Sequence, residues 1–430
     1  MGRTMAGRLS ALLLVTIFAA CSAGSGSEQE AVPMREINYW SMWCDYEPQA
    51  AVLKQAAAAF EEESGIHVNL VWVGRSITEY LDDALKAEEV VDLFDDDMKR
   101  VCTQLSAYCL DLEEMAAAAG YDDYAVPVLT QAVRSWAGSL RCIPHQPYTT
   151  GVFFTLSSFA AAGLVDDQGQ PVVPRTWDEF LNTCDALKKA GYLPLAQDEG
   201  FVAFLYGYLL ARIGGQKTAS DLVCSGGWTE SDAARQAALC VQELWDKGYL
   251  NREGAEPFPQ GEDRLGQGSA AMVVSGSWVP FEVTEHTGCE EEWGFFNFPD
   301  LGGQDGGTAA CVGAQAMAVC RESRDPEAAF QFILYVTSGR WDQEMSKACN
   351  NIPADVRNTE WPTLVAGVRE DFLAQTSAYD WNMGLNDNPA VFDALWTNLL
   401  DLFAGRIDAG QFLQQMDAAY AASGEDVEIS

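Results

Sequence analysis

Charged and aromatic side chains follow three predicted strands near the N-terminus of the 430-residue chain. Ligands bind outside the carboxyl ends of the strands in open parallel sheets, so we expect these side chains to converge on one edge. An indole can lie against the C–H face of a sugar ring, and carboxylates accept strong hydrogen bonds from sugar hydroxyls. The pattern therefore favours a carbohydrate ligand. The residues concerned are Trp40, Trp43, Asp45, Arg75, Asp95, Asp96 and Asp97.

Each of these residues also has an ordinary structural explanation. A single tryptophan such as Trp43 can belong to the core, and an acid of the 95–97 run can lie on a solvated loop or at a helix N-terminus. The run could instead bind a cation or a basic group of the ligand, although it lacks the D-x-[DN]-x-[DN]-G spacing of a calcium loop. The position of the acids at the end of a strand is what favours a site.

The sequence contains no motif for catalysis or for a metal centre. G-x-S-x-G, H-E-x-x-H and the phosphate-binding pattern G-x-x-x-x-G-K-[ST] are absent. The three histidines are scattered, and no C-x-x-C pair occurs. A glycosidase would need two carboxylates about 5–5.5 or 6.5–9.5 Å apart, a geometry that sequence cannot test. Hydrolases and metalloproteases therefore lack support from motifs, and no cofactor or metal ion is indicated; a surface carbohydrate-active hydrolase stays an alternative.

Local patterns predict the elements that hold the candidate residues. A helix should begin at Pro48, bury a stripe that includes Leu53 and Phe60, and end at Gly65. The alternation of strands and helices implies right-handed crossovers and a mostly parallel sheet. The predicted strands are 36–40, 66–73 and 90–94, and the second helix is 77–89.

The remainder of the chain continues the α/β pattern and then becomes helical. Thr176 and Glu179 have the spacing of a capping box, and Ser231 is placed to cap a further helix. From Pro326 onward helices dominate. The predicted fold class is α/β with a helical C-terminal third, with later strands at 192–196, 272–275 and 314–319 and later helices at 391–403 and 411–421.

Length and charge exclude several functional classes. The chain has 63 acidic and 26 basic residues and a formal net charge of −37, which would repel nucleic acid and anionic lipid. Hydrophobic residues make up 48%, so neither a disordered acidic tail nor a polytopic membrane protein fits. The length suggests two or three domains.

The first residues have the composition of an export signal. Arg3 and Arg8 precede the apolar run 9–20, which is too short to span a membrane as a helix. The sequence Phe18-Ala-Ala-Cys21 resembles the lipobox of bacterial lipoproteins, with phenylalanine in place of the usual leucine. We predict a signal peptide at 1–20, lipidation of Cys21 and a flexible tether at 21–35. An ordinary secretory signal is the alternative.

Twelve cysteines are present, and eleven remain once Cys21 is set aside. An odd number leaves at least one thiol unpaired within the chain. Cys184 and Cys240 lie on apolar helical faces, where buried thiols are expected. Cys102 and Cys109 could form a local bridge, which the sequence leaves open.

Several segments, in order through the chain, resemble one protein family. Taken together behind the lipobox, they resemble bacterial extracellular solute-binding proteins of the carbohydrate ABC-transporter type, the group that includes maltose-binding protein. The segments are Phe60 to Val68, Thr150 to Thr155, Pro174 to Leu181, Gly268 to Trp278, Phe298-Pro299, Asp325 to Phe330 and Asn351 to Ala354.

The resemblance implies a periplasmic-binding-protein-like fold of two α/β lobes that are joined by a multi-segment hinge and close over a ligand. The N-terminal lobe would comprise 36–145 and 288–340, and the C-terminal lobe 146–287 and 341–430. The resemblance also implies that the chain is not itself an enzyme. The partners would be a carbohydrate, expected to be an oligosaccharide, and the permease subunits of an ABC importer. The protein would act as a monomer outside the cytoplasm, held at the cell membrane only by its lipid. A sensor or structural lipoprotein with the same fold is a further alternative.

The resemblance also assigns residues. Trp278 matches a tryptophan that stacks on sugar in the family, and Trp381 lies where the C-terminal lobe often adds an aromatic side chain. Asp97, and either Asp45 or Glu47, match positions that hold sugar hydroxyls. Lesser candidates are Trp136 and Trp228, whereas Trp245 and Trp396 are expected in the core. The candidate ligand-binding residues are thus Trp43, Asp45, Glu47, Arg75, Asp95, Asp97, Trp278 and Trp381.

Overall fold

A computed structural model describes residues 35–303 and 307–425 of the chain. The predicted signal peptide and Cys21 lie outside these ranges. Within them, the strands are β1 (Arg35–Ser41), β2 (Ile66–Trp72), β3 (Leu93–Asp97), β4 (Ile143–Thr155), β5 (Leu193–Ala196), β6 (Ala270–Gly276), β7 (Trp293–Phe296), β8 (Ala309–Val319) and β9 (Ser377–Tyr379).

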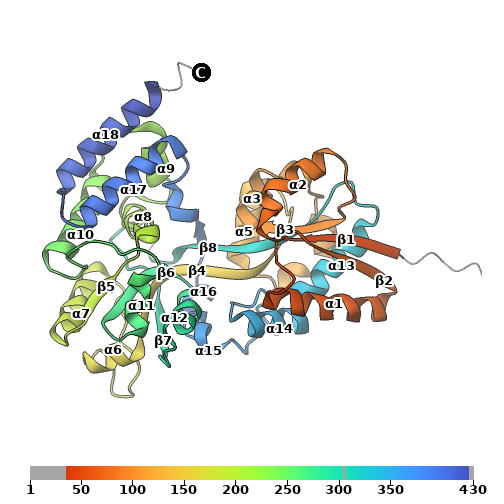
Figure 1. Cartoon of the computed structure of the whole chain (residues 1–430), viewed down its shortest axis with the longest axis horizontal. Coiled ribbons are helices and arrows are strands. Elements are labelled where there is room, and N and C mark those ends of the chain that lie inside the picture. The colour runs from red at the N-terminus through yellow and green to blue at the C-terminus, as the bar shows by residue number, and fades with distance from the viewer. Residues whose placement is uncertain (1–34, 304–306, 426–430) are drawn as a thin grey trace, which may run out of the picture. The chain divides into compact units, whose positions relative to one another are not determined.

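Helices connect and cover the strands (Figure 1). The α-helices are α1 (Pro48–Ser64), α2 (Ile77–Lys86), α3 (Met98–Thr103), α4 (Glu113–Ala118), α5 (Pro127–Ala137), α6 (Leu156–Ala161), α7 (Trp177–Lys189), α8 (Val202–Gly214), α9 (Thr218–Ser225), α10 (Asp232–Asp246), α11 (Gln260–Gly266), α12 (Val279–Thr287), α13 (Pro326–Thr337), α14 (Gly339–Cys349), α15 (Thr363–Ala366), α16 (Arg369–Leu373), α17 (Pro389–Phe403) and α18 (Ala409–Glu425). Short 3-10 helices include η1 (Gly74–Ser76), η4 (Glu199–Phe201) and η5 (Trp381–Gly384).

The α/β class is confirmed, but the sheet is mixed and not mostly parallel. Its strand order is β2-β1-β3-β8-β4-β6-β5, with β7 paired to β4 and β9 paired to β8. β1 pairs in parallel with β2 and β3, as the first crossovers predict. β8 then pairs antiparallel with β3 and β4, and β4 pairs antiparallel with β6 and β7. The mostly parallel sheet was wrong because β8, from a much later part of the chain, lies between β3 and β4 and runs antiparallel to both.

Two long strands, β4 and β8, run side by side through the sheet (Figure 1). The C-terminal part of β8 pairs with β3, and its first residues pair with β9. β4 begins against β8 and continues against β6 and β7. A register shift falls between His145 and Pro147, where Gln146 has a φ of 49°. These two strands therefore link elements that are far apart in the sequence.

Local signals correctly predict many of the helices. α1 begins at Pro48, buries Leu53 and Phe60, and ends at Gly65, whose φ of 72° is left-handed. The Thr176–Glu179 capping box is present at the start of α7. Ser231 caps α10 by accepting a hydrogen bond from the Ala234 amide.

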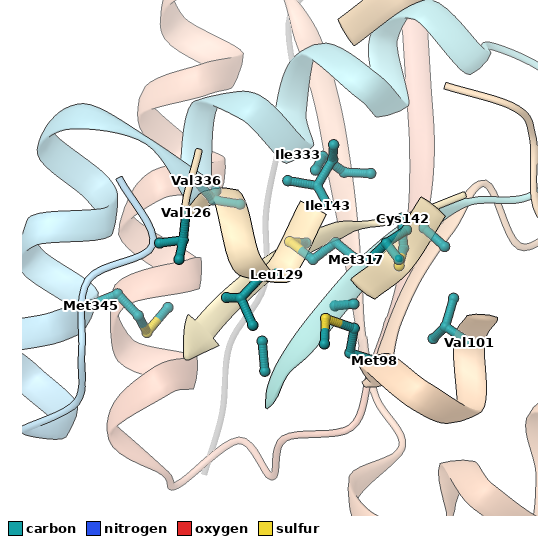
Figure 2. Close-up of a cluster of buried hydrophobic side chains, with 14 of the residues drawn as sticks. Met98, Val101, Val126, Leu129, Cys142, Ile143, Met317, Ile333, Val336 and Met345 are labelled. Atoms are coloured by element: carbon teal, nitrogen blue, oxygen red, sulfur yellow. The ribbon is translucent and has the colours of Figure 1, made fainter. Parts of the chain in front are cut away.

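The apolar residues form two buried clusters. The first gathers around β1, β3 and β8, and it includes Trp341 and Met345 of α14. Figure 2 shows a part of it, where Met98 and Leu129 lie beside Met317. The second cluster surrounds α8, which is buried along nearly its whole length. The division of the chain into lobes at the stated boundaries stays a prediction.

One charge lies inside the second cluster. The guanidinium of Arg212 on α8 is 1% exposed. It donates to the backbone oxygens of Phe298 and Ala309, to the Asn297 side-chain oxygen and to the Tyr379 hydroxyl, over 2.7–3.2 Å. All these acceptors are neutral, so hydrogen bonds, and not ion pairing, offset the cost of burying this charge.

Candidate functional site

Three aromatic side chains from distant parts of the chain meet in one cluster. The rings of Trp278 and Trp381 stack with centroids 6.1 Å apart and an interplanar angle of 27°. Tyr148 on β4 presents its ring edge-on to both, at 6.0 Å from each. Trp381 remains 41% exposed, so this cluster offers indole surface to a ligand.

Local backbone geometry places both indoles. Trp278 lies two residues after the end of β6, and its ring folds back over Gly276, where any β-carbon would collide with it. Trp381 opens η5, in which Asn382 and Met383 have left-handed φ values of 50° and 55°. These conformations are costly for residues other than glycine, and packing must hold them in place. Met383 is buried against Gly207 of α8, where a side chain would collide.

A cavity of about 270 Å³ adjoins this cluster. Its lining comes from the start of α3, the end of α5, β4, β8, β9 and η5. The cavity is lined by Asp97, Met98, Lys99, Trp136, Tyr148, Val312, Gly313, Tyr379, Asp380, Trp381 and Asn386. It thus combines aromatic faces with carboxylate, ammonium and amide groups.

Lys99 of α3 links α5 to the residue that precedes η5. Its ammonium lies 2.9 Å from a carboxylate oxygen of Asp380 and 4.1 Å above the ring of Trp136. Both side chains of the ion pair are partly exposed, so the pair is accessible to a polar ligand. A ligand hydroxyl could donate to Asp380 and accept from Lys99 at the same point.

The acid run has a different structure from the one predicted. The predicted strand 90–94 begins later, as β3, and Asp95 to Asp97 lie within it and pair with β8. Asp95 is buried and accepts a hydrogen bond from the Met42 amide at 2.7 Å, and burial raises its pKa to about 7. The strand prediction was wrong because acids are unfavourable in strands by propensity alone, and only pairing to β8 compensates.

The three acids have separate surroundings. Asp96 forms an ion pair with Arg100. Asp97 caps α3 by accepting from the Arg100 amide at 2.9 Å, and burial raises its pKa. Of the three, only Asp97 lines the cavity. Asp95 instead ties the segment after β1 to β3.

The other N-terminal candidates form a second group around the start of α1. Arg75 donates to Glu47 at 2.6 Å and to the Met42 backbone oxygen at 2.7 Å, and its guanidinium lies 4.7 Å above the ring of Trp43. Trp43 is 7% exposed and belongs to the first cluster, whereas the Asp45 side chain is exposed. This group does not line the cavity, and its role in binding stays a prediction.

The structure therefore unites Asp97, Trp278 and Trp381 in one region. Sequence reasoning missed Tyr148, Lys99, Asp380 and Asn386 as cavity residues. Asp380 and Lys99 had one available signal, since Asp380 immediately precedes Trp381 and Lys99 lies two residues after Asp97. Tyr148 lies in β4, whose prolines and polar residues conceal a strand.

No group of three or more His, Cys, Asp or Glu side chains in residues 35–303 and 307–425 is placed to hold a metal ion. Within the same ranges, no helix has the length and hydropathy needed to cross a membrane. Cys184 is buried and Cys240 partly buried, both as thiols.

Comparison with known proteins gives a family match. The model of a family described as bacterial extracellular solute-binding protein matches residues 55–357. No curated protein sequence matches the chain.

Solved structures share the fold at low sequence identity. A probable secreted solute-binding lipoprotein from Streptomyces coelicolor is similar with a TM-score of 0.72 at 15% identity, over 90% of this chain and 98% of that one. A cyclic alpha-maltosyl-1,6-maltose binding protein from Arthrobacter globiformis has a TM-score of 0.67 at 17% identity, over 90% and 98%. A sugar transporter from Bacillus licheniformis, solved with stachyose, has a TM-score of 0.60 at 17% identity, over 90% and 100%.

Proposed function

The chain belongs to the family of bacterial extracellular solute-binding proteins, and we propose that its solute is a carbohydrate, specifically an oligosaccharide. The protein would bind this sugar outside the cytoplasm and deliver it to the permease subunits of an ABC importer. It would do so as a monomer, anchored through a lipid on Cys21.

One observation carries the proposal: stacked indoles lie beside a polar cavity. Trp278 and Trp381 provide apolar faces, and Asp97 and Asp380 provide charged acceptors within reach of the same region. Sugar recognition needs this combination because a pyranose has an apolar C–H face and a rim of hydroxyl groups. The relatives whose names mention stachyose and a cyclic maltosyl-maltose support the same ligand class.

The proposed binding mode gives each residue a task. The sugar ring lies against the partly exposed indoles of both Trp278 and Trp381, and Trp278 also holds Trp381 in place through their stacked contact. Its hydroxyls donate to Asp97 and Asp380 and accept from Lys99. Because the cavity holds about 270 Å³, slightly below the roughly 300 Å³ of the smallest ordinary ligand pockets, further sugar units would extend out of it along the exposed indole.

Calorimetric titration with malto-, raffinose-type and chito-oligosaccharides tests the ligand class. We expect at least one series to bind and to be recovered unchanged. Trp278→Ala should abolish this binding while the fold survives. Tyr80→Ala is the matched control, because Tyr80 is a 58% exposed aromatic residue on α2. Formation of a shortened sugar would refute a purely binding role and favour the hydrolase alternative.

Metabolic labelling with palmitate tests the lipid anchor. The wild-type chain should incorporate label and sediment with membranes, whereas Cys21→Ala should do neither. An unlabelled wild-type chain released to the medium would favour an ordinary secretory signal instead.

A further inference from the structure

Four of the cysteines gather in the first hydrophobic cluster, and none of them has a part in the proposed function. Cys102 is on α3, Cys142 precedes β4, and Cys109 and Cys320 face each other in an antiparallel bridge. All four are at most 2% exposed. Figure 2 shows Cys142 and Met98 together with other apolar side chains of this cluster.

The closest thiols are those of Cys102 and Cys142. Their sulfur atoms lie 3.7 Å apart. Both are free thiols in the structure. Because a disulfide has a bond length of about 2.05 Å, the two sulfur atoms would approach by roughly 1.6 Å when the bond forms. The pairing left open by the sequence, Cys102 with Cys109, is less favoured. The Cys109 thiol donates to the Leu105 backbone oxygen at 3.3 Å, and its bridge partner is Cys320.

We propose that Cys102 and Cys142 form a disulfide bond in the exported protein. Disulfides form and persist in oxidising compartments, and the family to which the chain belongs is extracellular. The bond would close a loop of 40 residues that contains α4 and α5. It would restrict the unfolded chain and stabilise the native state.

The oxidation balances with a disulfide-bearing oxidant. The thiolate of one cysteine attacks the oxidant's disulfide and forms a mixed disulfide, which releases one thiol. The thiolate of the second cysteine then attacks the protein sulfur of this mixed disulfide, which forms the Cys102–Cys142 bond and releases the oxidant's second thiol. The two cysteines lose two protons and two electrons, and the oxidant gains them as two thiols. Since both cysteines are buried in the native state, the reaction takes place while the chain folds or opens.

The bond would also stabilise one wall of the candidate site. Lys99 and Cys102 share α3, and Trp136 lies on α5 within the closed loop. The cross-link would hold α3 against the start of β4, which later contributes Tyr148 to the cavity. This consequence depends on the proposed function, whereas the bond itself does not.

Peptide mapping of the purified chain, refolded with reduced and oxidised glutathione, tests the pairing. The protein is denatured, alkylated without reduction and digested with trypsin and chymotrypsin, which can cut after Leu105 and Tyr108 to separate Cys102 from Cys109. We expect a linked Cys102–Cys142 peptide pair that is lost on reduction. Cys184, a buried thiol on α7, is the internal control and should be alkylated without reduction. An alkylated Cys102, or Cys102 linked to Cys109, would overturn the proposal.

Thermal melting gives a second readout. Oxidised wild-type protein should melt several degrees above the same protein treated with reductant. Cys102→Ser and Cys142→Ser should each abolish this difference, whereas Cys184→Ser should keep it. The comparison is made within each variant, so a general loss of stability does not affect it. A difference that persists in Cys102→Ser would overturn the proposal, and if the variants do not fold, the peptide map of the wild-type chain decides.

Discussion

Replacing Trp381 by alanine removes the most exposed aromatic surface of the candidate site. Trp381 contacts Trp278, Tyr148 and Phe204 on its inner side and is 41% exposed on the other. The exposed part is the surface that a sugar would cover. We therefore expect Trp381→Ala to weaken carbohydrate binding while the chain stays folded.

The exposed area sets the size of the loss. With about 250 Å² for an indole side chain, the exposed 41% amounts to roughly 100 Å². At about 25 cal/mol per Å², full coverage contributes about 2.5 kcal/mol, and coverage of one face about 1.2 kcal/mol. Since about 1.4 kcal/mol corresponds to a tenfold change, the Kd should rise between about 8-fold and about 70-fold.

Titration calorimetry with the tightest-binding oligosaccharide measures this change. Tyr80→Ala should leave the Kd unaltered, because Tyr80 lies on α2, outside the aromatic cluster and the cavity. Thermal melting confirms that both variants fold. A rise in Kd of less than about 3-fold for Trp381→Ala, in a folded variant, would show that the sugar does not lie on this indole.

Three further predictions concern stability. Arg212→Met leaves buried carbonyl and side-chain oxygens without a donor and should lower the free energy of unfolding in urea by roughly 3–5 kcal/mol. Arg406→Met, at an exposed position, is the control and should cost little. Equal costs would show that the buried hydrogen bonds of Arg212 do not stabilise the fold. Burial, with neighbouring carboxylates, raises the pKa of Glu262 to about 9 from 4.5, so the folded chain keeps a proton that the unfolded chain releases. The free energy of unfolding should therefore fall as pH rises, by up to roughly 4 kcal/mol between about pH 6 and 9. Glu262→Gln should flatten this dependence on pH. An unchanged dependence in the variant would show that Glu262 does not cause it. Thr176→Ala removes the acceptor for the Glu179 amide and should lower the free energy of unfolding by about 1 kcal/mol. Thr176→Ser is the conservative control, because serine keeps the hydroxyl. Identical melting of the two variants would exclude a stabilising role for the cap.

Local sequence was sufficient for the elements with a strong signal of their own. Pro48 and Gly65 mark the ends of α1, and the Thr176–Glu179 spacing marks the start of α7, because these interactions lie within a few residues of the chain. The family was likewise readable from the order of the family-like segments, and the family match over residues 55–357 confirms the family. Trp278 and Trp381 could be singled out through that resemblance.

The pairing of distant segments was decided only by the tertiary structure. β4 is buried along most of its length and carries prolines and polar residues, so neither alternation nor propensity indicates a strand. The burial of Asp95, the ion pair of Lys99 with Asp380 and the approach of Cys102 to Cys142 all depend on contacts between residues 40 or more positions apart. The sequence by itself thus determined the class of protein and the local helix ends and supplied several candidate site residues, whereas long-range packing determined which of those candidates lie near one cavity.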